Sequence, residues 1–208
     1  MKRNNTLSGC LCALGCEVLY GMSYIFTKQA TQTSSALSLL GWRFLIAFLL
    51  MNLLLVFRIV HINIRGKHIA PLLTVAMFCP VLYFLGETFG ISKTTASESG
   101  VIIACIPVVT LFASMIILRR KPKRLQVIGI LITLVGVLIT VVAVGMSSSF
   151  SVAGYILLSA AVVSYALYCV FVEKAGSFTE VEITYTMLGA GAVVLCKWFS
   201  QTTLLMNG

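Results

Sequence analysis

Acidic side chains are scarce in this sequence, which contains six glutamates and no aspartate. Charged residues of both signs make up only 10% of the 208 residues, and hydrophobic residues make up 59%. Soluble domains carry about 25% charged residues. A soluble fold of this composition would have too few polar side chains to cover its surface. The composition therefore predicts a protein that is solvated by lipid.

Histidines and metal-binding motifs are also few, which argues against an enzyme. The two histidines, His61 and His68, fall in a predicted loop and not at membrane depth, where a general base would be needed. The segment 21–24 (GMSY) lacks the second glycine of the Gly-x-Ser-Gly nucleophile motif of an intramembrane protease. No H-E-x-x-H motif is present, and no two of the seven cysteines have C-x-x-C spacing. We therefore predict no catalytic residues, no metal and no cofactor.

Long apolar runs dominate the rest of the sequence. Each is close to the length that a helix needs to cross a hydrocarbon core of about 30 Å. Open-ended spans must be helical, because every backbone polar group has to be satisfied within the segment. We predict an all-α integral membrane protein with about seven transmembrane helices, at residues 7–27, 36–57, 69–90, 97–118, 125–145, 152–172 and 183–200.

The basic residues, which give a net charge of +9, lie mostly in the short gaps between the apolar runs. This placement argues against a nucleic-acid surface. Eleven flank alternate ends of the spans: Lys2, Arg3, Arg58, Arg65, Lys67, Arg119, Arg120, Lys121, Lys123, Arg124 and Lys174. Three flank the opposite ends (Lys28, Lys93 and Lys197), and Arg43 lies within the second span. We predict that the protein lies in the cell membrane, and the positive-inside rule predicts that its amino terminus is cytoplasmic. The 119–124 turn is expected to lie beside anionic lipid head groups.

A weak internal repeat relates the first and sixth spans. Tyr20-Gly21 precedes residues 28–30 (KQA), and Tyr165-Ala166 precedes residues 173–175 (EKA). The offset of about 145 residues corresponds to five spans, and an odd number of spans inverts the second copy, as in secondary transporters. The sequence thus predicts a first five-helix repeat at 1–145 and an incomplete second repeat of about two helices at 146–208.

Four motifs, in this order and spacing, resemble the EamA-like family of the drug/metabolite transporter superfamily. They are residues 20–28 (YGMSYIFTK), residues 42–47 (WRFLIA), the stretch 94–110 that contains Pro107, and the segment 129–137. The family often has Trp in place of Tyr20, and Glu after the fourth span, where this chain has only basic residues.

The resemblance implies transport of a small polar metabolite, such as an amino acid, by alternating access, with export favoured. Family members usually have ten spans in two inverted halves, so the resemblance predicts that this chain is truncated after about seven spans. A homodimer or a second chain would then complete the bundle, and proton coupling is an open expectation. The alternatives are a non-transporting remnant or subunit and, against the charge asymmetry, a seven-helix receptor.

Ionisable groups inside a membrane are functional candidates because burying them is costly. Glu17 lies about 15 Å into the first span, and Gly21, Tyr24 and Lys28 follow on the same helix face. Arg43 enters the second span to a depth of about 10 Å. A Glu17–Arg43 pair could bind a zwitterion or release a proton, or it could only neutralise two buried charges.

The other candidates are a carboxylate, several aromatic residues and a proline. Glu87 and Tyr83 are one turn apart and could line an outer vestibule, although a glutamate near the interface is more often solvated. Pro80 and Pro107 are expected to bend the third and fourth spans, and bent helices often mark transport sites. The predicted substrate-binding residues are Glu17, Tyr20, Tyr24, Arg43, Tyr83, Glu87, Pro107, Tyr165 and Tyr168.

Overall fold

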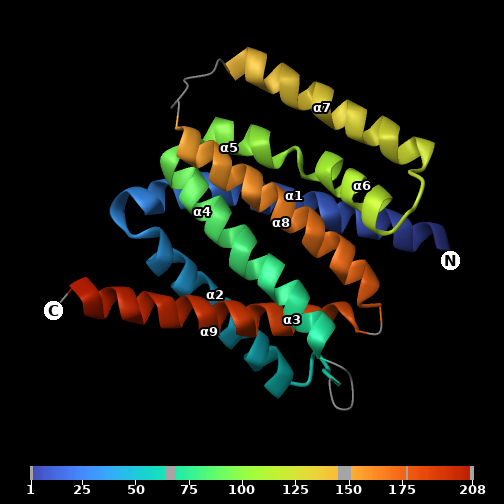
Figure 1. The fold of residues 1–208 in the computed structure, drawn as a ribbon. Coiled ribbons are helices and arrows are strands. Elements are labelled where there is room, and N and C mark those ends of the chain that lie inside the picture. The colour runs from blue at the N-terminus through green and yellow to red at the C-terminus, as the bar shows by residue number, and fades with distance from the viewer. Residues whose placement is uncertain (1, 64–68, 145–150, 177, 207–208) are drawn as a thin grey trace.

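The computed structural model describes residues 2–63, 69–144, 151–176 and 178–206, and this part of the chain is helical apart from its connections (Figure 1). The elements are α1 (Lys2–Thr33), α2 (Ala36–Val56), α3 (Ala70–Ala76), η1 (Met77–Leu82), α4 (Tyr83–Lys93), α5 (Ala96–Ile103), α6 (Ile106–Ile117), α7 (Arg124–Val144), α8 (Val152–Lys174) and α9 (Glu180–Met206). Because α3, η1 and α4 form one bent rod and α5 and α6 another, the described residues form seven rods. The predicted all-helical membrane fold is confirmed.

Five rods within the described residues are long and apolar enough to cross a membrane: Leu7–Thr33, Ala36–Val56, Ala70–Lys93, Ala96–Ile117 and Val152–Lys174. They correspond to five of the seven predicted spans. The predicted fifth span is α7, in which Arg124–Ile139 forms a shorter apolar helix. The predicted seventh span falls within α9, which is helical from Glu180 to Met206 but is not one of the five.

Both predicted bends are present at prolines. Pro80 lies inside the π-helical segment η1, and the preceding residue, Cys79, has non-helical backbone angles (φ −139°, ψ 118°). The fourth rod is interrupted at Ala104 and Cys105, and α6 restarts at Ile106 with Pro107 in its first turn. Proline cannot donate the helical hydrogen bond, so the helix bends or restarts where it occurs.

Two of the helix starts bring a glutamate into the protein interior. At the start of α5, the Thr95 side chain accepts a hydrogen bond from the Glu98 N–H, and Glu98 Oε2 accepts one from the Thr95 N–H at 2.8 Å. Thr179 and Glu182 form the same reciprocal capping pair at the start of α9. Such capping boxes satisfy backbone donors that the first helical turn leaves unpaired.

Helices α4 and α8 form the centre of the bundle and lie against each other along their length (Figure 1). Small residues permit this approach. A Cβ atom on Gly86 would lie 2.9 Å from the Leu157 carbonyl oxygen, and one on Gly90 would lie 2.5 Å from Leu158 Cγ. Small residues one turn apart are typical of close helix packing in membranes.

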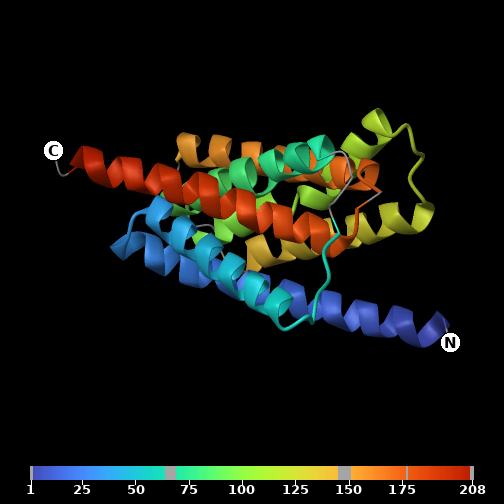
Figure 2. The same ribbon diagram turned by 90° about the horizontal axis from the view of Figure 1, so that it is seen from below.

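The other large helix contact joins α2 and α9, which run along one edge of the bundle (Figure 2). Its core contains Leu40, Phe44 and Ala192, and the Phe44 ring lies against Gly191. At the opposite edge lies α7, which contacts α5 (Figure 1).

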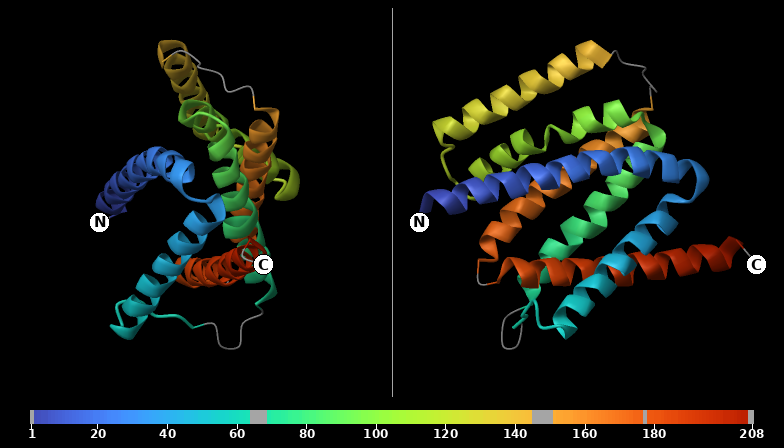
Figure 3. Two further views of the ribbon diagram at one scale, coloured as in Figure 1. Left: turned by 90° about the vertical axis from the view of Figure 1, so that its left-hand side faces the viewer. Right: turned by 180° about the vertical axis from the view of Figure 1, so that it is seen from behind.

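Helix α1 stays close to the bundle only in its second half. Residues 7–19 are exposed, whereas Tyr24 and Thr27 are buried against the neighbouring helices. Figure 3 shows α1 on one side of the molecule, away from the layer formed by α4 and α8. The amino-terminal half of α1 therefore has no helix beside it within the described residues.

Candidate functional site

Glu87 is the carboxylate around which the candidate site is built. It lies in α4, two turns before the end of that helix, and only 3% of it is exposed. The expectation that Glu87 is solvated near the membrane interface was therefore wrong. The sequence places it near the end of a span, but α1 and α8 cover it.

Three tyrosines surround one oxygen of this carboxylate. The hydroxyl groups of Tyr20, Tyr83 and Tyr24 donate to Glu87 Oε1 at 2.5, 2.6 and 2.8 Å. Tyr83 precedes Glu87 by one helical turn, whereas Tyr20 and Tyr24 lie one turn apart on α1. The carboxylate thus joins α1 to α4 through a single acceptor atom.

The protons of this network do not suffice for all of its contacts. The hydroxyls of Tyr20 and Tyr83 also contact each other, which makes four contacts among three hydroxyl groups and one oxygen. Each tyrosine hydroxyl carries one proton, so three protons cannot fill four hydrogen bonds. When all three hydroxyls donate to Glu87, the contact between Tyr20 and Tyr83 is therefore not a fourth hydrogen bond.

No cation in the part of the chain that the structure describes neutralises this carboxylate directly. Within the described residues, no lysine or arginine forms an ion pair with Glu87, and its second oxygen, Oε2, has no hydrogen-bond partner. An unpaired carboxylate inside a membrane protein is expensive unless donors share its charge or a proton removes it. The three tyrosine hydroxyls are the donors that share the charge of Glu87.

The wall opposite α1 is aromatic and comes from α8. The ring centroids of Tyr83 and Tyr165 are 4.9 Å apart, and those of Tyr165 and Tyr168 are 5.3 Å apart. Both α8 tyrosines are half-buried and lie against the same core cluster as Tyr24 and Tyr83. The site is therefore formed by helices from both predicted repeats.

A lysine fixes α1 next to the site. Lys28 Nζ donates to the backbone carbonyl oxygens of Ile91, Ser92 and Thr94 at 2.9, 3.1 and 2.5 Å. These carbonyls belong to the end of α4 and the turn after it, where the helix leaves acceptors unpaired and its dipole favours a cation. Lys28 therefore holds α1 against α4 at the end of the bundle nearer to Glu87.

Comparison with known proteins agrees with this architecture. Residues 7–142, well over half of the chain, match the EamA-like transporter family. The chain belongs to the EamA-like transporter family. It is 29% identical over 210 residues to a Bacillus subtilis (strain 168) protein named "Uncharacterized transporter YcxC". That alignment covers 100% of this chain and 66% of the relative, so the chain spans just under two thirds of the relative's length. No solved structure matches the chain.

Six of the nine predicted binding residues of this EamA-like chain lie together in the structure. They are Tyr20, Tyr24, Tyr83, Glu87, Tyr165 and Tyr168. Their role in binding stays a prediction. What the structure adds is that one carboxylate oxygen organises the tyrosines of α1 and α4.

The other three predicted residues lie outside this cluster. Glu17 is exposed, and within the described residues no ion pair or hydrogen bond joins it to Arg43, so the postulated pair does not form. Arg43 instead stacks over the Phe84 ring at 5.1 Å. Glu17 does lie on the face expected from helical spacing, but α1 has diverged from the bundle there.

Pro107 is exposed at the start of α6 and lines a different cavity, considered below. Of the two histidines, His61 is exposed, and His68 lies outside the described residues.

Sequence reasoning missed two further buried carboxylates. Glu98 is 5% exposed and Glu182 is 2% exposed. Glu98 accepts a hydrogen bond from the Tyr155 hydroxyl at 2.5 Å, and Glu182 accepts one from the Asn63 N–H at 3.1 Å. The pattern Thr-x-x-Glu at 95–98 and 179–182 is a capping-box signal and could have identified both as structural.

Proposed function

We propose that this chain moves a small polar metabolite, such as an amino acid, across the cell membrane by alternating access, with export as the favoured direction. The observation that carries the proposal is the buried Glu87 beneath three tyrosine hydroxyls. A carboxylate without a cationic partner inside a membrane bundle is a functional group by default, because a purely structural role would not justify its energetic cost. Membership of a transporter family supports the same conclusion.

The cluster suggests how such a substrate is bound. The ammonium group of an amino-acid-like substrate pairs with Glu87 and displaces tyrosine hydroxyls, while the rings of Tyr83 and Tyr165 contact its apolar part. A proton on Glu87 competes for the same oxygen. Substrate and proton therefore exclude each other at one site, which would couple metabolite movement to an opposing proton flux.

The position of the cluster between the proposed repeats supports alternating access. Tyr20, Tyr24 and Glu87 belong to the first repeat (1–145), and Tyr165 and Tyr168 belong to the second (146–208). Helices α2 and α9, which hold equivalent places in the two repeats, contact each other. Rocking of one repeat against the other would open this cluster to each side of the membrane in turn.

We further propose that the amino terminus is cytoplasmic. Figure 1 places it at the same end of the bundle as the turn between α6 and α7 and the connection between α8 and α9. Most of the basic residues flank this end, as the positive-inside rule requires of a cytoplasmic face. Arg65 and Lys67 lie outside the described residues.

We further propose that a second copy of the chain or another chain packs against the bundle. The apolar faces that support this proposal are on α1 and α2, where Leu14, Leu19, Leu49 and Leu50 are each more than half exposed. Cross-linking of the purified chain in liposomes tests this contact, and a chain that stays monomeric would contradict it.

Transport by the purified full chain in liposomes tests the function. Wild-type protein, Glu87→Gln and the control Glu180→Gln are assayed for uptake of a labelled amino-acid mixture, with and without a pH gradient. Glu180 is an exposed carboxylate at the start of α9, so both variants lose one negative charge. We expect Glu87→Gln to lose uptake and its response to the gradient while remaining folded, and Glu180→Gln to keep both. Equal transport by Glu87→Gln and wild type would remove this carboxylate from the site.

A further inference from the structure

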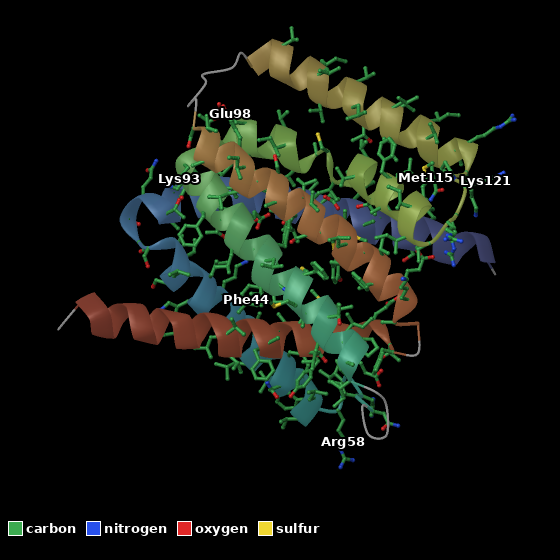
Figure 4. The ribbon with its side chains drawn as sticks, viewed as in Figure 1. Phe44, Arg58, Lys93, Glu98, Met115 and Lys121 are labelled. Carbon is green, nitrogen blue, oxygen red and sulfur yellow. The ribbon has the colours of Figure 1, made fainter. Side chains whose placement is uncertain are left out.

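A second cavity, separate from the tyrosine cluster, lies where α6, α7 and α8 approach one another. Its volume is about 770 Å³, and residues of all three helices line it, among them Thr110, Met115, Ile130 and Cys169. It opens at the turn between α6 and α7, where Figure 4 marks Met115 and Lys121. None of the residues that bind Glu87 lines it.

The mouth of this cavity is strongly basic. Five of the six residues 119–124 are lysine or arginine, and Arg120, Lys121 and Lys123 line the opening. One carboxylate, Glu173 at the end of α8, pairs with Arg120 there. Within the described residues no carboxylate pairs with Lys121 or Lys123. The mouth therefore keeps an excess of positive charge that attracts an anion.

The interior of the cavity is suited to an apolar chain. Leu111, Met115 and Ile130 form its walls, and α6 contains no fully buried residue. Gly129 also lines the cavity, and a Cβ atom at that position would meet nothing within 4 Å. Open space thus continues from the basic mouth between two apolar helices.

We propose that this cavity binds an anionic phospholipid, with its phosphate at Lys121 and Lys123 and one acyl chain between α6 and α7. Basic pockets between transmembrane helices are suited to anionic lipid head groups. A soluble anion would leave the apolar walls uncovered, and the ammonium group of a zwitterionic lipid would meet like charge at the mouth. The charge and the apolar walls together therefore favour the anionic lipid, independently of the transport reaction.

Native mass spectrometry of the full chain with phosphatidylglycerol tests this site. The variant Lys121→Gln/Lys123→Gln is compared with Arg58→Gln/Lys93→Gln, which removes the same charge from exposed positions outside the cavity (Figure 4). Each basic residue near an anionic surface contributes about fivefold in affinity, so we expect the first variant to bind about 30-fold more weakly and the second to match wild type. Neither variant breaks the Arg120–Glu173 pair.

A substitution without any charge change tests the interior. Gly129→Leu fills the cavity and should also weaken binding, whereas Gly21→Leu, at an open position of α1, should not. Phosphatidylcholine with the same acyl chains should bind weakly to every variant. The proposal is overturned if the two charge variants bind phosphatidylglycerol equally, if phosphatidylcholine binds as well, or if soluble glycerol phosphate displaces the bound lipid.

Discussion

The close contact between α4 and α8 leads to a prediction in which one kind of substitution has opposite effects at two positions. A Cβ atom on Gly90 would lie 2.5 Å from Leu158 Cγ and 2.7 Å from Leu158 Cδ2. Leu158 is completely buried, so its side chain has little room to move. At Gly100, in α5, a Cβ atom would meet nothing within 4 Å. Gly90→Ala therefore overfills a contact that Gly100→Ala leaves unchanged.

The magnitudes follow from two terms. Replacing glycine by alanine inside a helix stabilises it by about 0.5–1 kcal/mol. Carbon atoms normally approach to about 3.5–4.0 Å, and overfilling a packed interior costs about 1–3 kcal/mol. Gly90→Ala should therefore lower the free energy of unfolding by about 0–2.5 kcal/mol, which is the overfilling cost less the gain from the helix term. Gly100→Ala should raise it by about 0.5–1 kcal/mol, because only the helix term applies.

Unfolding of the purified chain by sodium dodecyl sulfate in mixed micelles, followed by circular dichroism, measures both values. The same preparations can be assayed for transport, because separating α4 from α8 would move Tyr83 away from Tyr165. If Gly90→Ala proved as stable as Gly100→Ala, the close approach of α4 and α8 would not exist in the bilayer protein. The proposed site between the repeats would then lose its structural basis.

Two further predictions concern orientation and the tyrosine network. In a background without native cysteines, Lys121→Cys should react with a membrane-impermeant maleimide only after the cells are permeabilised, because the proposed topology places the basic turn in the cytoplasm. Labelling of intact cells would contradict this topology. Tyr83→Phe removes a hydrogen bond to a carboxylate and should cost about 1.5–3 kcal/mol, whereas Tyr185→Phe removes a bond to the neutral Asn52 and should cost about 0.5–1.5 kcal/mol. Equal losses in the detergent unfolding assay would argue against a charged acceptor at Glu87.

The helices themselves could be predicted from the sequence. The second span was expected at 36–57 and is found at Ala36–Val56, and the bends at Pro80 and Pro107 are where proline placed them. These features are local. In a bilayer each helix has to satisfy the hydrogen bonds of its own backbone. The length of an apolar run therefore largely determines where a helix begins and ends, and a proline determines where it bends.

The candidate site could be predicted only in part. Helical periodicity correctly placed Tyr24 and Lys28 on one face of α1, and both face α4. The same periodicity placed Glu17 on that face and led to the pair with Arg43, which does not form. Glu87 was expected to be solvated and is buried. Periodicity identifies the faces of a helix but not the neighbour of each face, and it does not show where a helix leaves the bundle.

A bundle of apolar helices with basic connections thus follows from the order of residues alone, whereas the packing of the helices establishes which polar groups meet inside the bundle. Helix contacts depend on where small residues such as Gly86 and Gly90 allow two backbones to approach, and on how each rod tilts. Hydropathy records neither of these. Only after α1 is placed against α4 do the hydroxyls of Tyr20 and Tyr24, which lie 67 and 63 residues from Glu87 in the chain, join that of Tyr83 at one oxygen of Glu87.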